Sequence, residues 1–450
     1  MFQDSVDPAM LRHHGDVDAR PGMLDFAVNV RGTAPPAWLR DRIAARLDDL
    51  GRYPSAEDEA AARAAVAARH GRRPDEVLLL AGAAEGFALL PRLAPRLAAV
   101  VHPSFTEPEL ALREAGVPVT RVILEPPYTL DPDLVPEEAD LVVLGNPTNP
   151  TSVLHPAAVI AALRRPGRLV VVDEAFADAV ADGTVAGAAV DGGPGGGGRE
   201  FGGTGDNVAG AARNVASGAV MRGAVADPGG ARPASSSARR TPDLSSTPSA
   251  PAASSIRTAP AVDVEPGAPV RSTSRPGSDS PTSHIAGEPE SLAALAAPDV
   301  LVLRSLTKTW ALAGLRCGYV LGAPEVLARL TQGRPHWPLG TLQLEAIIAT
   351  AEPAAVTASR RHADEIAVER AGMIERLTAL GLDVHTPAAG PFLLLRVPDG
   401  ELLRKRLADR GIAVRRADTF PGLGPDHLRV AVRGAGEVDR LVEGLRASLW

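Results

Sequence analysis

The chain has 450 residues, enough for two or three domains, and its hydrophobic content of 45% supplies an ample core although aromatic residues make up only 3%. The net charge of −7 argues against nucleic acid as a partner, because neutralising phosphates requires a basic face. One cysteine excludes an intramolecular disulfide framework, and we find neither a signal sequence nor an apolar run of membrane-spanning length, so we expect a cytoplasmic protein with no membrane partner.

The first half of the chain predicts alternating strands and helices. After about 22 polar residues, a short strand ends near Asn29, and helices follow at 36–50 and 57–70. Apolar runs predict strands at 77–80, 98–101, 119–124, 141–144 and 169–172, separated by helices from residue 85 and at 106–115 and 156–163. This alternation is typical of an α/β fold with a mainly parallel sheet and helical crossovers, which binds ligands at the carboxyl ends of its strands.

Candidate ligand-binding turns follow three of these strands. Gly82 leads a turn into a helix at Ala83 and Ala84, where backbone N–H groups and the helix dipole favour an anion. Asn149 lies in a turn stiffened by two prolines and offers its amide to a ligand. Asp173 ends its strand with a carboxylate. These groups are expected to meet at one edge of the sheet.

Residues 184–287 differ in composition from the rest of the chain. Glycine, serine, proline and arginine dominate, and apolar periodicity is absent. A phosphate-binding glycine loop would need a strand before it and a helix after it, and neither is evident. We therefore predict a disordered insertion, which a surface site tolerates because the entropy of loop closure grows slowly with length.

A buried strand at 300–303 leads to Lys308, which is one of only two lysines in the chain; the other is Lys405. A lysine retained where arginine is otherwise used indicates amine chemistry, because an ammonium can lose its proton and form a Schiff base. A surface loop lysine is the alternative.

The neighbours of Lys308 favour the chemical interpretation. Ser305 and Thr307 supply hydroxyl donors, and Arg316 supplies a guanidinium fork that suits a phosphate dianion. An amine beside such an anion site is what pyridoxal phosphate (PLP) requires.

The last third of the chain predicts an α+β region. Helices are expected at 324–330, 341–350, 354–380 and 436–449, and strands at 392–396, 412–415 and 427–432. We expect 1–50 to form an N-terminal arm with part of a small domain, 51–330 a large domain interrupted by the insertion, and 331–450 the rest of the small domain.

The segment Ser305-Leu-Thr-Lys308, followed by Gly314-Leu-Arg316, resembles the PLP-lysine signature of fold-type I aminotransferases of class I/II. The resemblance implies an enzyme in which Lys308 binds PLP and moves protons, and Asp173 keeps the pyridine nitrogen protonated. It assigns the cofactor phosphate to the turn at Ala83 and Ala84 with Ser305, Thr307 and Arg316. No metal is expected.

Further residues take roles from the same resemblance. Phe105 would stack on the pyridine ring, and Asn149 would bond its phenolic oxygen. Tyr53, in Arg-Tyr-Pro, would reach the cofactor phosphate of a neighbouring subunit, which implies a homodimer. Arg429, in Leu-Arg-Val, would hold the substrate carboxylate, and Asn29 would contact the substrate. His13, His14, Arg415, Arg416 and Arg433 are additional anion-binding candidates; an ordinary surface role is the alternative for each.

The opening Leu24-Asp25-Phe26 with Asn29 is similar to that of threonine-phosphate decarboxylases and histidinol-phosphate aminotransferases. Phe176, where the family usually has tyrosine, is seen in the decarboxylase branch. Our first hypothesis is therefore decarboxylation of a small phosphorylated amino acid in cobalamin biosynthesis. Amino transfer of the histidinol-phosphate type is the second, and a non-catalytic PLP-binding sensor or scaffold is the third. Ser152 departs from the family pattern, which has glycine there.

Overall fold

The computed structural model describes residues 8–13, 15–184 and 288–449. The chain divides into two compact units, one formed by 1–191 with 279–450 and the other by 192–278, and all described residues belong to the first. The predicted insertion falls outside the described residues apart from its first position. Because the structure treats the arm, the large sheet and the C-terminal third as one unit, the division into domains near residues 50 and 330 stays a prediction.

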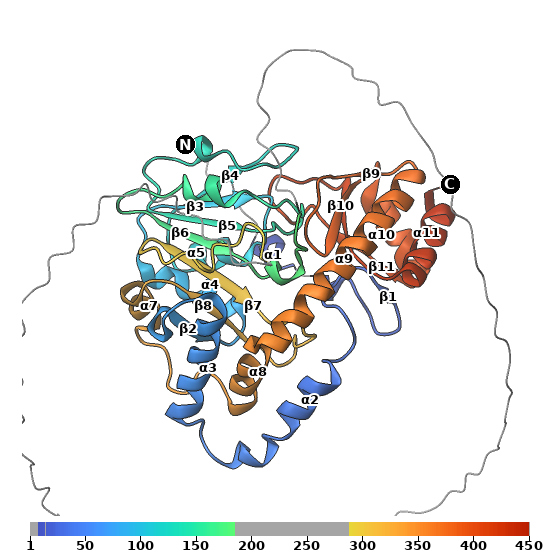
Figure 1. Cartoon of the computed structure of the whole chain (residues 1–450). Helices are drawn as coiled ribbons and strands as arrows, with labels where there is room; N and C mark the ends of the chain where they lie inside the picture. The colour runs from blue at the N-terminus through green and yellow to red at the C-terminus, as the bar shows by residue number, and fades with distance from the viewer. Residues whose placement is uncertain (1–7, 14, 185–287, 450) are drawn as a thin grey trace, which may run out of the picture. The chain divides into compact units, whose positions relative to one another are not determined.

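A seven-stranded sheet forms the centre of the described unit (Figure 1). Its strands, in spatial order, are β2 (Val77–Leu80), β8 (Gly318–Leu321), β7 (Val300–Ser305), β6 (Leu169–Asp173), β5 (Leu141–Gly145), β3 (Ala98–His102) and β4 (Val119–Ile123). Only β8 runs antiparallel to its neighbours, and the remaining pairs are parallel. The mainly parallel α/β sheet is therefore confirmed, and β8 is a strand that sequence reasoning did not separate from the Lys308 loop.

Helices cover both faces of this sheet because both faces of its strands are apolar. Leu79 points to one face and Leu80 to the other, as the alternation along a strand requires. One face packs against α2 (Ala37–Ala44), α3 (Ala56–His70), α6 (Ala157–Ala161) and α8 (Thr341–Ala351). The other packs against α4 (Ala83–Leu89), α5 (Glu107–Glu114) and α7 (Pro324–Thr331).

A second, four-stranded sheet lies in the C-terminal third, with the order β12 (Arg415–Arg416), β13 (His427–Ala431), β10 (Phe392–Arg396) and β9 (Asp383–Val384). Its own apolar core includes residues of α9 (Pro353–Ala379), α10 (Gly400–Asp409) and α11 (Ala435–Leu449). The long helix α9 contacts α8 at one end of its course and reaches β9, β10 and α11 (Figure 1). It therefore connects the packing of the two sheets.

The structure corrects three predicted elements. The strand expected at 412–415 is two short strands in different sheets, β12 and β11 (Ile412–Ala413), and β11 pairs with β1 (Leu24–Asp25) from the N-terminal segment. The helix expected at 36–50 ends at Ala44, because Arg46 pairs with Asp58 of α3 and Glu345 of α8 and draws the chain into a 3-10 turn. Helix α10 was not anticipated.

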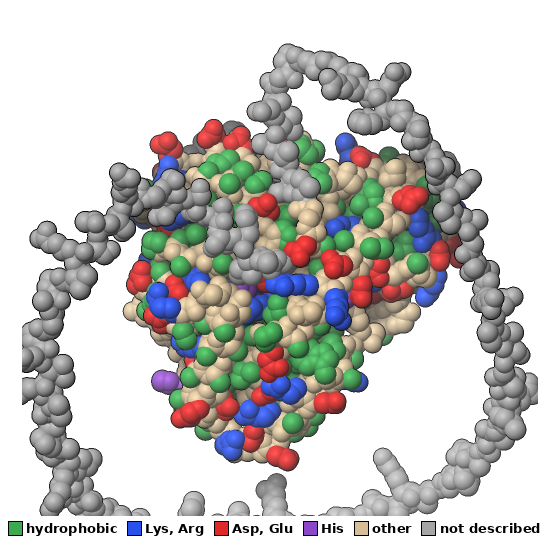
Figure 2. All heavy atoms as spheres, viewed as in Figure 1, with side chains coloured by type: hydrophobic (Ala, Val, Ile, Leu, Met, Phe, Trp, Pro, Cys, Tyr) green, Lys and Arg blue, Asp and Glu red, His purple; other side chains and the backbone are tan. Residues whose placement is uncertain are grey.

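Short helical turns complete the described chain: α1 (Pro8–Leu11) and the 3-10 segments Gly15–Val17, Leu47–Gly51, Pro74–Glu76, Leu90–Leu93, Pro132–Leu134 and Ala177–Ala179. Acidic and basic side chains are interspersed over the face shown in Figure 2. Among the helices that the structure describes, none combines the length and apolarity needed to cross a bilayer. The cytoplasmic location stays a prediction.

Strand register decides which polar groups meet. Gly145 of β5 lies opposite Asp173 of β6, and Asp173 lies opposite Leu303 of β7. The parallel strands β5, β6 and β7 therefore end at one edge, where the turns carrying Asn149, Asp173 and Lys308 begin.

Candidate active site

A pocket of about 510 Å³ opens at this edge of the sheet. It is lined by every site residue expected from the sequence except Tyr53, namely Asn29, Ala83, Ala84, Phe105, Asn149, Asp173, Ser305, Thr307, Lys308, Arg316 and Arg429. These residues come from the N-terminal segment, from the ends of the large-sheet strands and from β13 of the small sheet. The pocket is therefore completed only when both sheets are in place.

Asp173 and Lys308 carry opposite charges on the pocket wall. Burial raises the pKa of the Asp173 carboxyl to about 6, and the charge of Glu174 acts in the same direction, whereas the Ala175 N–H and the Lys308 ammonium lower it. The Ala175 N–H donates to Asp173 Oδ1 at 3.0 Å. A cation that binds beside this carboxyl would lower its pKa and favour the ionised form.

Hydroxyl and guanidinium groups gather beside Lys308. Ser305 Oγ and Thr307 Oγ1 lie 2.8 Å apart, and both residues are buried. Arg316 adopts a left-handed backbone conformation with a φ of 59°. No carboxylate of the described chain pairs with its guanidinium, which donates only to the Ala313 carbonyl at 3.4 Å. The charge of Arg316 is therefore available to an anion.

Gly82 fits the same corner of the pocket closely. Its φ is 84°, and a Cβ built on it would lie 3.0 Å from Arg316 Nη2 and 3.2 Å from Arg316 Cζ. Only glycine combines this backbone conformation with that clearance. The turn into Ala83 and Ala84 and the guanidinium thus form one concave wall, in which Ala84 contributes no polar side chain.

Asn149 and Arg429 meet across the pocket. Arg429 Nη1 donates to Asn149 Oδ1 at 2.7 Å, and Nη2 donates to the Ala27 carbonyl. Arg429 Nε is buried without a partner in the described structure. Burial lowers the pKa of the Arg429 guanidinium to about 9, and the nearby charge of Arg415 adds to this decrease. The arrangement favours binding an anion at Arg429.

The remaining predicted residues occupy the other walls. Asn29 is buried, and its Oδ1 has no partner in the described structure, which leaves an acceptor at the pocket. Phe105 packs against Phe87 with ring centroids 5.9 Å apart and presents an apolar surface. Phe176 also lines the pocket and contacts Phe392 edge to face at 4.9 Å.

Of the additional anion-binding candidates, Arg415 and His13 line the pocket. Arg415 is 3% exposed and lies opposite Arg429 in the pairing of β12 with β13. It donates to the His13 carbonyl and to Thr419 Oγ1, each at 2.7 Å, and lies 3.5 Å from Asp18. Burial lowers the pKa of its guanidinium to about 10, although Asp18 opposes the change.

Arg416 and Arg433 are not among the residues that line the pocket. Arg416 forms an ion pair with Asp418. Arg433 donates to the backbone carbonyls of Asp25, Val432 and Val28. His14 lies outside the described residues.

Tyr53 is not part of the pocket of its own chain. Its side chain is 72% exposed and stacks on Trp337, itself 58% exposed, with ring centroids 4.4 Å apart. Its expected role, from a neighbouring subunit, stays a prediction.

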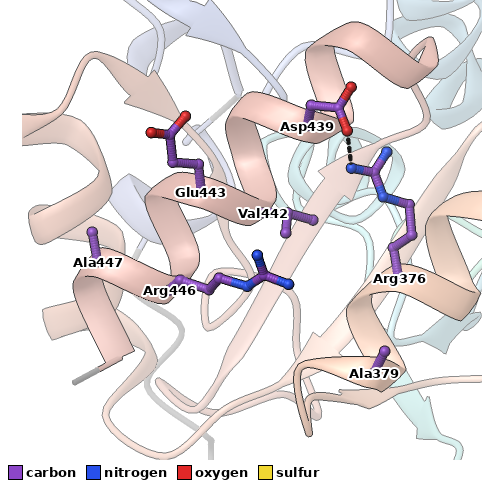
Figure 3. Close-up of a pocket in the computed structure, with 7 residues that line it drawn as sticks. All are labelled: Arg376, Ala379, Asp439, Val442, Glu443, Arg446 and Ala447. Atoms are coloured by element: carbon purple, nitrogen blue, oxygen red, sulfur yellow. Dashed lines mark hydrogen bonds and ion pairs between the residues drawn. The ribbon is translucent and has the colours of Figure 1, made fainter.

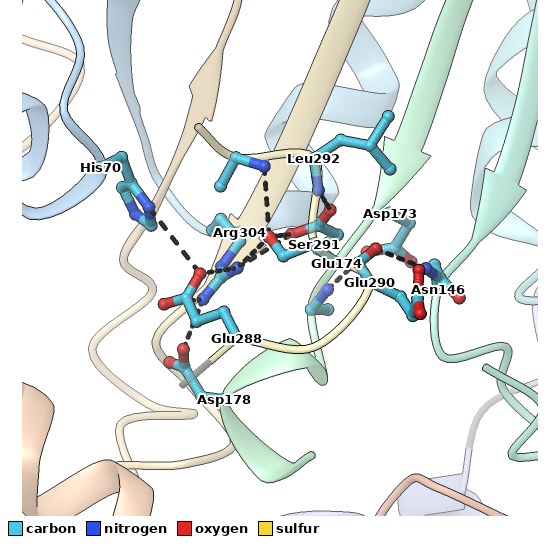
Figure 4. A network of polar contacts seen from close by, with 12 residues as sticks. His70, Asn146, Asp173, Glu174, Asp178, Glu288, Glu290, Ser291, Leu292 and Arg304 are labelled. Atoms are coloured by element: carbon cyan, nitrogen blue, oxygen red, sulfur yellow. Dashed lines mark hydrogen bonds and ion pairs between the residues drawn. The ribbon is translucent and has the colours of Figure 1, made fainter. Parts of the chain in front are cut away.

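A buried ionic network lies next to the pocket residues along the chain (Figure 4). Arg304, next to Ser305, donates to Glu174 at 2.9 Å, to Asp178 at 2.5 Å and to Glu288 at 3.1 Å. Arg69 pairs with Asp178 and Glu288 as well. The only sequence signal for this network is an arginine within an apolar strand, and sequence reasoning missed it.

A second hollow of about 600 Å³ lies between α9 and α11 (Figure 3). Its wall carries an ion pair between Arg376 and Asp439, and none of its residues lines the first pocket. It holds no buried titratable group and no nucleophile, so it offers no evident chemistry.

Pyridoxal phosphate fits the residues of the first pocket. Lys308 offers an amine for its aldehyde, Asp173 a carboxyl of raised pKa for its ring nitrogen, and Ser305, Thr307 and Arg316 donors for its phosphate. The close approach of Gly82 to the Arg316 guanidinium supports this fit, because a side chain at residue 82 would crowd the guanidinium that is available to the phosphate. No group of three or more metal-ligating side chains is found among the described residues.

Comparisons with known proteins agree with this chemistry. The model of the family "Aminotransferase class I and II" matches residues 21–209 and 280–445. A histidinol-phosphate aminotransferase of Mycobacterium bovis is 44% identical over 96% of this chain and 89% of its own length. A threonine-phosphate decarboxylase of Salmonella typhimurium is 32% identical over 33% of this chain and 41% of its own length.

Solved structures share the fold. The histidinol-phosphate aminotransferase of Clostridium acetobutylicum superposes with a TM-score of 0.65 at 18% identity and covers 94% of this chain and 98% of its own. The L-threonine-O-3-phosphate decarboxylase of Porphyromonas gingivalis gives 0.61 at 17% identity, with coverage of 94% and 98%. At these identities the likeness establishes the fold alone.

Proposed function

Because the chain belongs to the class I and II aminotransferase family, we propose that it transfers the amino group of a phosphorylated amine of the histidinol-phosphate type to a 2-oxo acid. The family and the fold are those of PLP-dependent enzymes, so the expected family, enzyme class and cofactor are confirmed. The identity of the substrate is the part that we propose here.

The comparisons favour amino transfer over our first hypothesis, decarboxylation of threonine phosphate. The match to the M. bovis aminotransferase extends over almost the whole chain, whereas the match to the S. typhimurium decarboxylase covers a third of it. The inference drawn from Phe176 is correspondingly weaker than the evidence of overall similarity. A non-catalytic sensor is disfavoured because the named relatives are enzymes.

The pairing of Arg415 with Arg429 is the observation that carries the proposal. Two buried guanidinium groups lie opposite each other on β12 and β13, and both line the pocket. Asp18 partly neutralises Arg415, and Arg429 retains an unpartnered Nε in the described structure. Together they suit the double charge of a phosphate. Histidinol phosphate carries a phosphate and no carboxylate, so Arg429, which the resemblance assigned to a substrate carboxylate, would instead face the phosphate together with Arg415.

The remaining residues would orient the reactants. When bound, PLP supplies an electron-withdrawing ring that weakens bonds at the substrate α-carbon. Lys308 would hold the cofactor and move a proton at that carbon, and Asp173 would keep the ring nitrogen protonated. Phe105 would cover one ring face, and Asn149 would donate to the phenolic oxygen. Arg429 would fix the orientation of the substrate.

Two parallel assays test the proposal. The purified protein is incubated with histidinol phosphate plus 2-oxoglutarate, and separately with threonine phosphate alone. We expect glutamate in the first mixture and no carbon dioxide in the second. Carbon dioxide released without a 2-oxo acid would support decarboxylation instead. Inertness in both, with the cofactor bound normally, would contradict both substrate assignments.

A further inference from the structure

Ser152, one of the positions where the chain departs from the family pattern, connects the turn that follows β5 with the segment that leads into β10. Its φ is 66°, a conformation that favours glycine, yet the residue is serine and fully buried. The backbone alone does not explain a serine there, because glycine would adopt this conformation with less strain. The side chain must therefore contribute something that offsets the strain.

Ser152 makes two hydrogen bonds to the segment that leads into β10. Its Oγ accepts from the Gly390 N–H at 2.7 Å, and its carbonyl accepts from the Ala389 N–H at 2.8 Å. Within its own turn, the Ser152 N–H donates to the Thr148 carbonyl at 2.7 Å. One residue thus ties the Asn149 turn of the large sheet to the segment that leads into β10 of the small sheet.

The segment on the other side is itself held in place. Arg370 of α9 donates to the carbonyls of Ala389 and Gly390 at 2.9 and 3.3 Å. A Cβ on Gly390 would lie 3.1 Å from Ser152 Oγ and 3.2 Å from Phe392 Cζ, so the glycine allows this close approach. Ser152 therefore bonds to an anchored strand entry.

These contacts are part of a series that leads from Ser152 to Arg429 and back to Asn149. Phe392 stands two residues after Gly390, and the guanidinium of Arg429 lies 5.7 Å from the Phe392 ring centroid. Phe392 and Arg429 belong to paired strands, in which Leu394 lies opposite Arg429. Arg429 donates to Asn149 at 2.7 Å, and Asn149 stands three residues before Ser152.

We propose that Ser152 is a positioning residue whose hydroxyl fastens the Asn149 turn to the entry of β10, so that Asn149 and Arg429 keep their relative placement in the pocket. This inference rests on the proposed roles of Asn149 and Arg429. The inference adds a residue that would act through Asn149 and Arg429 without contacting the substrate or the cofactor. It also explains why residue 152 is serine, because glycine has no hydroxyl to accept the Gly390 hydrogen bond.

Two variants separate the hydroxyl from the backbone. Ser152→Gly removes the hydroxyl and relieves the strained φ, so it is expected to fold. Ser152→Ala removes the hydroxyl and keeps the strain. Ser359→Ala is the matched control, because Ser359 is also buried and donates to a backbone carbonyl, within α9 and away from the pocket.

Hydrogen exchange of the segment 387–392 is the first measurement on the holoenzyme. Both Ser152 variants are expected to exchange the Gly390 amide about tenfold faster than the wild type, because a buried hydrogen bond of ordinary strength is lost. Ser359→Ala should leave that amide unchanged. Unchanged exchange in both Ser152 variants would overturn the proposal.

Anion binding and kinetics are the second measurement. We expect the Kd for inorganic phosphate, and the KM for the amino substrate, to rise about tenfold in both variants, with kcat changed by less than about threefold, because one positioning hydrogen bond is lost. The pH midpoint of the cofactor's visible absorption should also shift. Faster exchange without any change in phosphate binding or absorption would refute a positioning role. If histidinol phosphate proves not to be a substrate, the exchange, phosphate and absorption measurements still decide the role of Ser152.

Discussion

Two adjacent acidic residues, Asp173 and Glu174, differ in how many hydrogen-bond donors surround their carboxyl groups. Asp173 lines the pocket, receives one hydrogen bond from its own turn and has a pKa raised to about 6 by burial. Glu174 is buried in a network, where Ser291, Leu292 and Arg304 all donate to it. One carboxyl is short of partners and the other is surrounded by them.

This difference distinguishes a carboxyl available to bind a ligand from a carboxyl that stabilises the fold. A buried charge that lacks partners is costly for the folded chain unless a ligand supplies the missing interaction. A buried charge with a full set of partners holds elements together. Lys308 and Asp173 line the pocket, whereas Arg304 belongs to the buried ionic network. Substitutions on the two sides should therefore change different measured quantities.

The largest expected effect comes from Lys308→Ala. Removing the amine should lower kcat by at least about 10³-fold and abolish the cofactor's visible absorption band, because the attachment point and proton carrier are lost. The free energy of unfolding should change little. The chain's other lysine is a natural control: Lys405 is 64% exposed and only approaches Glu401, so Lys405→Ala should retain both activity and absorption. Retained absorption in Lys308→Ala would exclude it as the attachment point.

Arg304→Met should have the largest effect on stability. It leaves Glu174 without its cation, and Asp178 and Glu288 with Arg69 alone, so we expect the free energy of unfolding to fall by about 3–5 kcal/mol in urea denaturation. Arg63→Ala removes a more exposed pair with Glu59 and should cost only roughly 0.5 kcal/mol. Equal losses in the two variants would contradict the distinction between the buried network and surface pairs.

Asp173→Asn should reduce kcat by about 10²-fold, because a neutral amide no longer favours the protonated ring nitrogen. The contribution of Asp173 to stability should change with pH in the opposite direction to that of a salt-bridged acid. With its folded pKa raised to about 6 from 3.8, the Asp173 carboxyl binds the proton more tightly in the folded apoprotein than in the unfolded chain, so the contribution of Asp173 to stability declines as pH rises from about 4 to about 6. Thermal unfolding at several pH values would measure this contribution as the difference between the apo wild type and apo Asp173→Asn, which should change by the expected amount between about pH 4 and about pH 6.

The smallest effect is expected at Tyr53, which within one chain lines neither the pocket nor the buried network. If a neighbouring subunit receives its hydroxyl, Tyr53→Phe should weaken PLP binding by roughly tenfold, measured by titration of absorption, while the dimer persists in sedimentation. Val368→Ala, at a side chain that is 74% exposed, serves as the control. A monomeric wild-type protein, or unchanged PLP affinity in Tyr53→Phe, would count against the shared site.

Sequence reasoning identified the pocket residues that end strands or begin turns, because strand ends in a parallel sheet are recognisable as apolar runs followed by polar turns. Lys308 and Asp173 were found in this way, and the motif resemblance added Arg429. It missed the partners of Arg304, since ion pairs between residues as distant as 174 and 304 leave no periodic pattern. It also missed α10 and divided the region around 412–415 wrongly, because β11 and β12 belong to different sheets.

The sequence by itself determined the mainly parallel fold, the cofactor and the strand-end residues that line the pocket, because these depend on local patterns and on a motif with fixed spacing. The tertiary structure alone decided how the two sheets share the site. It placed Arg415 opposite Arg429, left Asn29 Oδ1 and Arg429 Nε without partners among the residues that the structure describes, and brought Ser152 to Gly390. These relations arise from register and packing between segments hundreds of residues apart, which no local pattern records.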